Sequence, residues 1–563
     1  MHHHYTALFT QCLKTQNLNL GKQLHSHLIK TSLTLDTFYT NRLIDIYCRC
    51  NSLESAQKAF NQLPAKNTHS WNTIISGFSR IGCFKKAHHL FDQMPERNVV
   101  SYNLLMSSLT RHGFYGESVG VFRRMQGECG FGFMDGFSFV SVVHTCACLG
   151  EVKLLRVVHG VGIVIGLEFD VVGCNALVDA YGKCGDPDHA YLVFSRMVER
   201  DIVSWTSMVG SYARVSRLDD ACSVFDQMPV KNTVSWTALI AGFAQSGQGK
   251  EALNLFEQML DEGIVPSAHT YVSVLSACAN LTLIERGKQV HGHIARSISL
   301  SFINNLFLSN SLIDMYCKCG DMASAVRLFE TSEDKDIITW NAIITGFAQN
   351  GHGHNSLSVF QRMLKAKVMP NHVTFLGVLS ACSHGGLLGE ALEIFYSMER
   401  DFGVIPRPDH YAALIDVLGR KNRLEEALDL ILTSSNGSDH VGMWGALLGA
   451  CQVHGNLALA ERAAKALFEL EPNNSGRFVM LSNIYASTGK WGDVSQVREL
   501  MTQRGLRKNA ALSWIDIRNE RHEFVAKDKC HIQIEQIYEM LDILVEHMMD
   551  FGYLILADLK FIE

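Results

Sequence analysis

Apolar and polar residues recur along this chain in a pattern that returns every 31 to 38 residues. Most units open with a segment such as residues 70–78, SWNTIISGF, in which apolar residues three and four apart share one helical face. About one helix later an Ala-x-x-x-Phe-x-x-Met segment follows, as at Ala87, Phe91 and Met94. A turn that often contains glycine separates the two segments. The pattern therefore predicts a helical hairpin in every unit.

Hairpins of this kind cannot bury their apolar faces alone, so they stack on their neighbours into a solenoid. We expect an all-α fold with about thirteen helix-turn-helix repeats over residues 2–439. Units of 35 residues, longer units and units of 31 residues alternate along this array. The first helices are predicted to begin at His2, Thr37, Thr68, Val99, Gly136, Val171, Ile202, Thr233, Ala268, Leu306, Ile337, His372 and Pro408.

The composition fits a continuous core, because 47% of the residues are hydrophobic and only nine are prolines. An apolar stretch of roughly 20 residues is needed to cross a bilayer. The apolar stretch at residues 160–167 is far shorter than that. We therefore expect no membrane segment.

Sixteen cysteines and recurring His-x-His pairs raise the question of a metal site. The cysteines return at the same places of successive units, as Cys146 and Cys278 do near the end of a first helix, and no Cys-x-x-Cys pair occurs. His25, His159 and His291 likewise occupy one position of one unit type. This periodicity favours packing, so we expect no metal ligands and no cofactor. Reduced thiols fit an intracellular compartment.

The alternation of 35-residue, long and short units resembles a plant subclass of the pentatricopeptide repeat family, over about residues 5–439. The resemblance implies a right-handed superhelical solenoid that binds single-stranded RNA, with one base read by each helical repeat. It implies neither catalytic residues nor a small-molecule substrate.

Three columns of residues support RNA binding. The second, fifth and thirteenth residues of a unit lie within about 80° of one another around its first helix. The second residue is mostly apolar and is predicted to pack against a base; these residues are Phe38, Val100, Val172, Val203, Val234, Phe307 and Ile338. The thirteenth residue is a cation in seven units and is predicted to contact phosphate; these residues are Arg49, Arg80, Arg111, Lys183, Arg214, Lys318 and Arg420.

In the family, the fifth and the last residue of a unit together select the base, and the resemblance carries this rule to eight units here. Amides, carboxylates and hydroxyls present different donors and acceptors to a base edge. Asn with Asn implies a pyrimidine, Asn with Asp a uridine and Thr with Asn an adenosine. The pyrimidine pairs are Asn41/Asn67, Asn72/Asn98 and Asn341/Asn371. The uridine pairs are Asn103/Asp135, Asn175/Asp201 and Asn310/Asp336. Thr206/Asn232 implies adenosine, and Thr237/Ser267 is ambiguous with a purine favoured.

The remaining units are expected to read little, since their fifth residues are Val140, Val272, Leu376 and Ala412. Simpler interpretations also stay open. Asn in fifth place could cap a helix, and the cations could merely keep this face solvated. A net charge of −6 is unusual for a nucleic-acid binder and predicts weak non-specific binding, with affinity resting on stacking and hydrogen bonds.

After residue 439 the pattern changes. Residues 440–517, with MWGALL at 443–448, resemble the two extension motifs that follow such arrays, which form tetratricopeptide-like hairpins. Residues 518–563 resemble the further extension of organellar RNA-editing factors, although Ala511-Leu512 replaces the Pro-Gly that is usual before Ser-Trp-Ile. The His-x-Glu and Cys-x-x-Cys signatures of a zinc deaminase do not occur. We therefore expect no enzymatic activity.

The resemblance leads to an expected function: site recognition in cytidine-to-uridine editing of an organellar RNA. Residues 440–563 would recruit a deaminase-bearing pentatricopeptide repeat protein in trans. Two alternatives remain, an RNA-binding factor for transcript stability, splicing or translation, and a protein scaffold of tetratricopeptide type. Mitochondria are favoured over plastids as the location, and no transit peptide is visible in the sequence.

Overall fold

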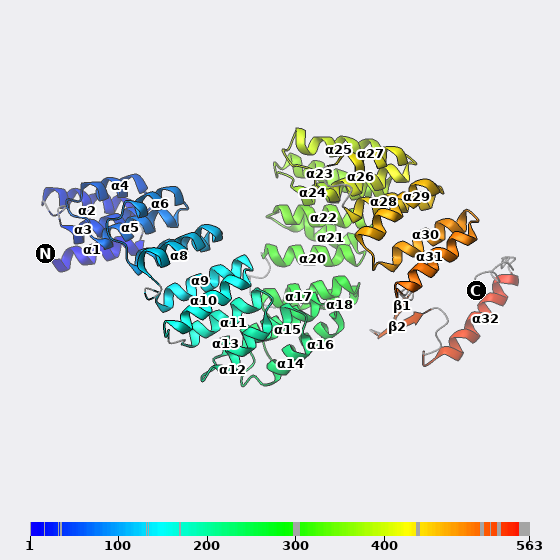
Figure 1. Ribbon diagram of the computed structural model, residues 1–563, viewed down its shortest axis with the longest axis horizontal. Coiled ribbons are helices and arrows are strands. Elements are labelled where there is room, and N and C mark those ends of the chain that lie inside the picture. The colour runs from blue at the N-terminus through cyan, green and yellow to red at the C-terminus, as the bar shows by residue number, and fades with distance from the viewer. Residues whose placement is uncertain are drawn as a thin grey trace. The chain divides into compact units, whose positions relative to one another are not determined.

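The computed structural model describes residues 2–550, except 16, 32, 34–35, 131, 133, 168–169, 297–304, 435–439, 507–511, 518–519 and 526–530. The chain divides into two compact units, Met1–Lys335 and Asp336–Glu563. Within each unit, helices follow one another in antiparallel pairs (Figure 1).

In the unit Met1–Lys335, each repeat contributes a first and a second helix. The first helices are α1 (His2–Thr15), α3 (Thr37–Arg49), α5 (Thr68–Arg80), α7 (Val99–Arg111), α9 (Gly136–Leu149), α11 (Val171–Lys183), α13 (Ile202–Arg214), α15 (Thr233–Gln245), α17 (Ala268–Asn280) and α20 (Leu306–Lys318). The second helices are α2 (Leu18–Lys30), α4 (Leu53–Gln62), α6 (Phe84–Asp92), α8 (Tyr115–Cys129), α10 (Val152–Val164), α12 (Pro187–Arg196), α14 (Leu218–Asp226), α16 (Gly249–Asp261), α18 (Ile284–Arg296) and α21 (Met322–Thr331).

The unit Asp336–Glu563 continues the same alternation. Its first helices are α22 (Ile337–Gln349), α24 (His372–Gly385), α26 (Pro408–Arg420), α28 (Val441–His454) and α30 (Ser475–Ser487). Its second helices are α23 (Gly353–Lys365), α25 (Leu388–Arg400), α27 (Leu424–Thr433), α29 (Leu457–Leu470) and α31 (Trp491–Gln503). An antiparallel hairpin of β1 (Leu512–Ile517) and β2 (Glu520–Val525) follows, and then α32 (Ile534–Asp550).

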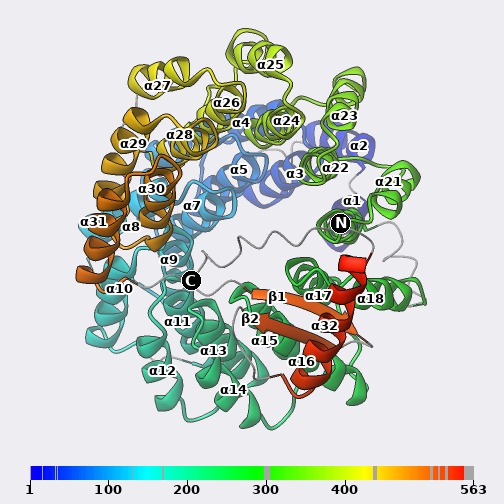
Figure 2. The ribbon, with the colours of Figure 1, turned by 90° about the vertical axis from the view of Figure 1, so that its right-hand side faces the viewer.

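All thirteen predicted starts coincide with the first residue of a helix. First helices pack on first helices, as α11, α13 and α15 do, and the second helices α12 and α14 form the other layer (Figure 2). The prediction of an all-α solenoid of helix-turn-helix repeats is therefore confirmed. The division at residues 439 and 517 stays a prediction.

Aromatic contacts between consecutive repeats explain why the two sequence segments recur. The phenylalanine of a second helix meets the edge of the Trp or Tyr at the start of the next first helix. Phe225 and Trp236 have ring centroids 4.7 Å apart, and Phe91 and Tyr102 have centroids 5.1 Å apart. Edge-to-face pairs of this kind add about 0.5–1.5 kcal/mol to the burial of the rings. Each such pair joins one repeat to the next.

Glycine within a first helix allows neighbouring first helices to approach closely. A Cβ added to Gly77 would lie 2.1 Å from Cys48 Sγ, and one added to Gly242 would lie 2.6 Å from Ala213 Cβ. Any side chain at these two positions would therefore push adjacent repeats apart. This contact accounts for the glycine in the segment SWNTIISGF and its relatives.

The recurring histidines make packing contacts between a long repeat and the repeat that follows it. His25 Nδ1 lies 2.8 Å from the Tyr47 hydroxyl, and His159 Nδ1 lies 2.9 Å from the Tyr181 hydroxyl. His291 and Tyr316 repeat this contact. Among the described residues, no group of three or more His, Cys, Asp and Glu could hold a metal ion. No helix among the described residues is long and apolar enough to span a membrane.

Candidate nucleic-acid interface

The last residue of a repeat caps the first helix of the next repeat. Asn67 Oδ1 accepts a hydrogen bond from Ser70 N at 2.9 Å, and Asp201 Oδ1 accepts one from Ser204 N at 2.8 Å. Short side chains with an acceptor oxygen satisfy the free N–H groups at a helix start. The same bond is formed by Asn98, Asp135, Asn232, Ser267, Asp336 and Asn371. Capping therefore belongs to the last residue, and the interpretation that the fifth residue caps a helix is wrong.

A cation directly before the cap holds this turn in place in several repeats. The guanidinium of Arg200 lies 4.9 Å from the ring centroid of Phe194, and its Nε donates to the Phe194 carbonyl at 3.0 Å. Lys231 lies over Phe225 at 4.7 Å in the same way. These contacts tie the end of a second helix to the residue that caps the next first helix.

The fifth residue of a repeat reaches the last residue of the same repeat. Asn175 Nδ2 donates to Asp201 Oδ1 at 3.0 Å, and Asn103 Nδ2 donates to Asp135 Oδ1 at 3.1 Å. The all-amide pairs are longer, at 3.3 Å for Asn341/Asn371 and 3.5 Å for Asn41/Asn67. The structure thus brings together both members of four of the eight predicted pairs.

The threonine pairs are arranged differently. Thr206 Oγ1 donates to the Ile202 carbonyl of its own helix. Thr237 Oγ1 donates to the Thr233 carbonyl at 2.6 Å and lies 2.6 Å from Thr270 Oγ1. Their hydroxyls are thus engaged with their own helix. Asn310 and Asp336 fall in different compact units.

The fifth-position asparagines are more deeply buried than a position on an open face predicts. The exposed fractions of Asn41, Asn72, Asn103 and Asn175 lie between 5% and 9%. Within the described residues the side-chain oxygen of each of these four has no hydrogen-bond partner. A buried acceptor without a partner is costly, at about 1–3 kcal/mol. Four repeats therefore carry the same unsatisfied acceptor, and in the repeats of Asn41, Asn103 and Asn175 it lies beside the residue that caps the next first helix.

The carboxylates of Asp201 and Asp135 stay ionised at neutral pH, because the pKa of each is lowered. Partial burial raises the pKa of Asp201, but hydrogen bonds from Ser204 and Asn175 outweigh it and hold the pKa below its usual value. Asp135 has a lowered pKa for the same reasons, with Ser138 and Asn103 as donors. An ionised carboxylate can only accept hydrogen bonds. It therefore suits the N3–H donor of uracil.

The second residues of the repeats form an exposed apolar column. Their exposed fractions run from 43% at Phe38 to 64% at Val172. Apolar side chains that a solenoid does not bury are available to pack against the faces of bases. The other members of the column are Val100, Val203, Val234, Phe307 and Ile338, all exposed.

Long repeats extend this column, which the sequence reasoning missed. Phe137 and Val373 stand second in long repeats and are 62% and 43% exposed. In a third long repeat the second residue is His269, whose ring centroid lies 5.5 Å from that of Phe307 in the next repeat. The apolar second place could have been found in the sequence had the long repeats been included.

Most cations in thirteenth place are already paired with an acid. Arg49 Nε lies 3.0 Å from Asp45, Lys183 Nζ 2.6 Å from Asp179, Lys318 Nζ 2.8 Å from Asp314 and Arg420 Nε 3.2 Å from Asp416. Each acid lies four residues earlier on the same helix. Arg214 lies 3.6 Å from Asp179 of the preceding repeat.

Arg80 and Arg111 differ from these five cations. Both are exposed, and neither forms an ion pair with an acid in the part of the chain that the structure describes. Asp179 and Asp314 stand in the sequence segments DAYGKCG and DMYCKCG, but the spacing of the acids from the cations was not used. Phosphate contact by the whole column therefore stays a prediction.

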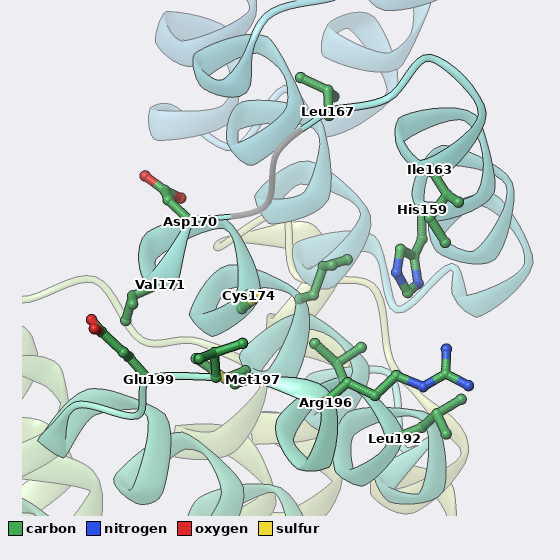
Figure 3. A pocket seen from close by; sticks show the side chains of 13 residues that line it. His159, Ile163, Leu167, Asp170, Val171, Cys174, Leu192, Arg196, Met197 and Glu199 are labelled. Carbon is green, nitrogen blue, oxygen red and sulfur yellow. The ribbon is translucent and has the colours of Figure 1, made fainter.

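A cavity of about 670 Å³ lies between the second helix α10 and the following repeat, α11 and α12 (Figure 3). Its wall includes Ile163, Leu192 and Met197, while Arg196 and Glu199 bring charge to it. A second cavity of about 520 Å³ occupies the corresponding place next to α18, α20 and α21. Both occur where a long repeat meets the next repeat, and no sequence pattern predicts them.

The C-terminal elements expose many apolar side chains. Trp514 and Ile515 on β1 are 49% and 51% exposed, and Met540 and Leu544 on α32 are 58% and 50% exposed. His522 Nδ1 lies 2.9 Å from His531 Nε2 beside them. A helix and a hairpin with this much apolar surface are typical of a protein-binding region.

The stacked hairpins define a helical-repeat protein, and four of its repeats carry the same polar pair of fifth and last residues. Models of protein families match the same repeats. The model described as PPR repeat matches residues 40–67, 69–99, 100–129, 172–202, 203–233, 307–337, 373–401 and 409–432. The model described as PPR repeat family matches 231–280 and 335–384, and the model described as E motif matches 454–516.

Similar proteins come from Arabidopsis thaliana. One pentatricopeptide repeat-containing protein is 40% identical over 548 residues, which cover 97% of this chain and 74% of the relative. Two others, named chloroplastic and mitochondrial, are each 33% identical over 95% and 97% of this chain. This chain spans only 58% and 55% of their lengths. The chain belongs to the pentatricopeptide repeat family.

The solved structures that are similar to this chain include that of the pentatricopeptide repeat protein PPR10 from maize. It is 20% identical, with a TM-score of 0.44, and the match covers 90% of this chain and 74% of that one. A structure of PPR10 in complex with an 18-nt psaJ RNA element also has a TM-score of 0.44, at 13% identity over 84% of this chain and 85% of that one.

Proposed function

We propose that the chain binds a single-stranded organellar RNA and selects a site for cytidine-to-uridine editing. Its repeats bind the RNA, and residues 440–563 recruit a separate deaminase-bearing protein of the same family. The location is a mitochondrion, with a plastid as the alternative. Family membership and the match to the E motif at residues 454–516 support this proposal.

The observation that carries RNA binding is the recurring link between the fifth and the last residue. In Asn175/Asp201 and Asn103/Asp135, an amide donates to a carboxylate at 3.0 and 3.1 Å, beside the exposed side chains of Val172 and Val100. A protein scaffold gains nothing from repeating a polar pair with an unsatisfied amide oxygen. A base supplies both an edge with donors and a face for the apolar residue.

The pairs assign a string of bases to consecutive repeats. It begins with two pyrimidines, a uridine, an unread position, a uridine and an adenosine. A purine, a second unread position, a uridine and a pyrimidine come next, and two weak positions end the string. One good polar pair is worth about 1–3 kcal/mol of discrimination between bases, so these repeats together can select one site among many.

Editing rather than binding alone is proposed because of the C-terminal region. The E motif, the hairpin of β1 and β2, and α32 add a large surface beyond the repeats that read bases. The exposed apolar side chains of this region suit a protein partner. Holding a tethered deaminase next to one cytidine would turn its reaction into a positioned, effectively local one.

Two measurements test base reading by the repeats and the role in editing separately. The purified chain should bind an RNA with the assigned string at least tenfold more tightly than one in which the uridines and the adenosine are exchanged, a difference of about 1.4 kcal/mol. Equal binding would overturn base reading. Loss of the protein in the plant should abolish cytidine-to-uridine conversion next to a matching sequence, at unchanged transcript abundance. A change in abundance or splicing without any editing defect would support the alternative function.

A further inference from the structure

One residue on the interface face is acidic in four repeats and uncharged in almost all the others. These are the ninth residues Asp45, Asp179, Asp314 and Asp416. Residues four apart on an α-helix differ by about 40° in direction, so the ninth residue stands between the fifth and the thirteenth on this face. The repeats of Asp179, Asp314 and Asp416 directly follow the long repeats whose fifth residues are Val140, Val272 and Leu376, and the repeat of Asp45 follows the first repeat of the chain. The acids therefore recur with the repeat order rather than at random.

Every one of these acids neutralises a cation that the RNA would otherwise meet. The pair Lys318/Asp314 is 2.8 Å long with both side chains partly exposed, at 36% and 46%. Asp179 faces two cations, Lys183 at 2.6 Å and Arg214 at 3.6 Å. Arg80 and Arg111 follow Ser76 and Ser107 at this spacing, and they have no acidic partner among the described residues.

We propose that these four aspartates tune the electrostatics of RNA binding, so that the phosphate contacts of the cation column are concentrated on Arg80 and Arg111. This inference rests on the proposed RNA-binding function. A phosphate that approaches Lys318 also approaches the carboxylate of Asp314, and the like charges repel each other. At Arg111 no such repulsion opposes the contact.

The consequence is an RNA binder whose affinity depends little on charge. Phosphate contacts carry no sequence information, and each one on single-stranded RNA makes log Kobs fall with log salt by a slope of about 0.7. Repeats in which an aspartate holds the cation contribute little to this slope. Selection among RNAs is then left to the base-reading pairs. This agrees with a net charge of −6 on a chain that binds RNA.

The test measures the salt dependence of RNA binding by the full chain. Asp314→Asn leaves the helix and the cation in place and removes one negative charge. We expect it to steepen the slope of log Kobs against log salt by up to about 0.7, and Asp179→Asn by up to about 1.4 because two cations are released. At low salt both variants should bind the assigned and the exchanged RNA more tightly by the same factor, roughly threefold or more.

A matched control is available on a second helix. Lys288 and Glu285 form an exposed ion pair 3.1 Å long on α18, and Glu285→Gln removes the same charge away from the interface. We expect it to leave the slope unchanged. If Asp314→Asn behaves like Glu285→Gln, the inference is overturned.

Removing cations from the natural chain gives an independent comparison. Arg111→Ala should lower the slope by about 0.7, whereas Lys318→Ala should change it little. Equal losses would overturn the inference. Failure of RNA binding itself is a different result: the unsubstituted chain would then show no preference for the assigned RNA at any salt concentration.

Discussion

Asn175 donates a hydrogen bond to Asp201 at 3.0 Å, although 26 residues separate them, and Asp201 accepts from Ser204 at the same time. The carboxylate of Asp201 therefore joins α11, the first helix of one repeat, to the start of α13, the first helix of the following repeat. The same carboxylate is assigned to read a base. Its orientation is fixed from two sides before any RNA arrives, so little side-chain entropy remains to be lost on binding.

Replacing Asp201 with Asn should weaken the choice of uridine at this repeat. A carboxylate only accepts hydrogen bonds, while an amide also donates and can serve the N3 acceptor of cytosine. We expect the ratio of affinities for RNAs with uridine and cytidine at this place to fall by about tenfold, within the usual 1–3 kcal/mol for one base. Fluorescence anisotropy with the two RNAs measures this ratio.

The helix start should survive this substitution, because Asn caps helices about as well as Asp. Thermal unfolding of the variant serves as the control, with a midpoint close to that of the unsubstituted chain. An unchanged uridine-to-cytidine ratio at an unchanged midpoint would contradict the reading role of Asp201.

Truncation of the exposed apolar column should weaken RNA binding without destabilising the fold. Val172 and Val203 are 64% and 51% exposed, so their replacement by Ala leaves the core intact. We expect the double variant to bind the assigned RNA about threefold to thirtyfold less tightly, in proportion to lost contacts with base faces. Val198, which is 98% exposed after a second helix, is the matched control. A similar loss in Val198→Ala would show that the column has no special role.

The histidines between long repeats and their successors should make stability depend on pH. Burial lowers the pKa of His25, His159 and His291 in the fold. The unfolded chain then binds protons more readily, near pH 6.5, so the stabilisation is complete above that pH and is lost as the pH falls through the folded pKa. We expect the unfolding midpoint to drop between pH 7 and pH 5.

Phenylalanine at these three positions should flatten the dependence of the unfolding midpoint on pH, because its ring carries no titrating group. The place accepts a phenylalanine, since Phe395 occupies the equivalent position in α25. Replacement of the exposed His354 by Asn serves as the control for the loss of a histidine. If the unfolding midpoint of the triple phenylalanine variant falls between pH 7 and pH 5 as much as that of the unsubstituted chain, this explanation is wrong.

A methyl group at Gly242 should loosen the stack of first helices. Its Cβ would lie 2.6 Å from Ala213 Cβ, and overpacking of this kind usually destabilises by about 1–3 kcal/mol. Gly210 lies in the neighbouring first helix with no atom within 4 Å of an added Cβ. Gly210→Ala should therefore leave stability unchanged or raise it slightly. Denaturant unfolding compares the two variants, and equal midpoints would contradict the close approach.

The helix starts could be predicted because their causes are local. The cap at Asn67 and the apolar spacing that follows it both stand in one short stretch of sequence, and similar stretches return in most repeats. The hairpin of β1 and β2 was not anticipated, since it occurs once and has no repeat to reveal it.

The site was only partly predictable, because its missing details depend on contacts between neighbouring helices. The columns of second, fifth and thirteenth residues follow from helical geometry alone. The burial of Asn103 and the double engagement of Asp179 depend on how the next repeat packs. No pattern within a single repeat contains that information.

The last residue of a repeat caps the next first helix and is also predicted to read a base. These two roles together limit which residue types can stand there. At eight helix starts the residue predicted to read a base also caps the helix, and only Asn, Asp and Ser occur there. A residue without a short acceptor would cost the helix about 1 kcal/mol at its start. Under the proposed base reading, one exchange among these three residues changes the preferred base and keeps the cap, whereas a long or apolar side chain at this place loses the cap.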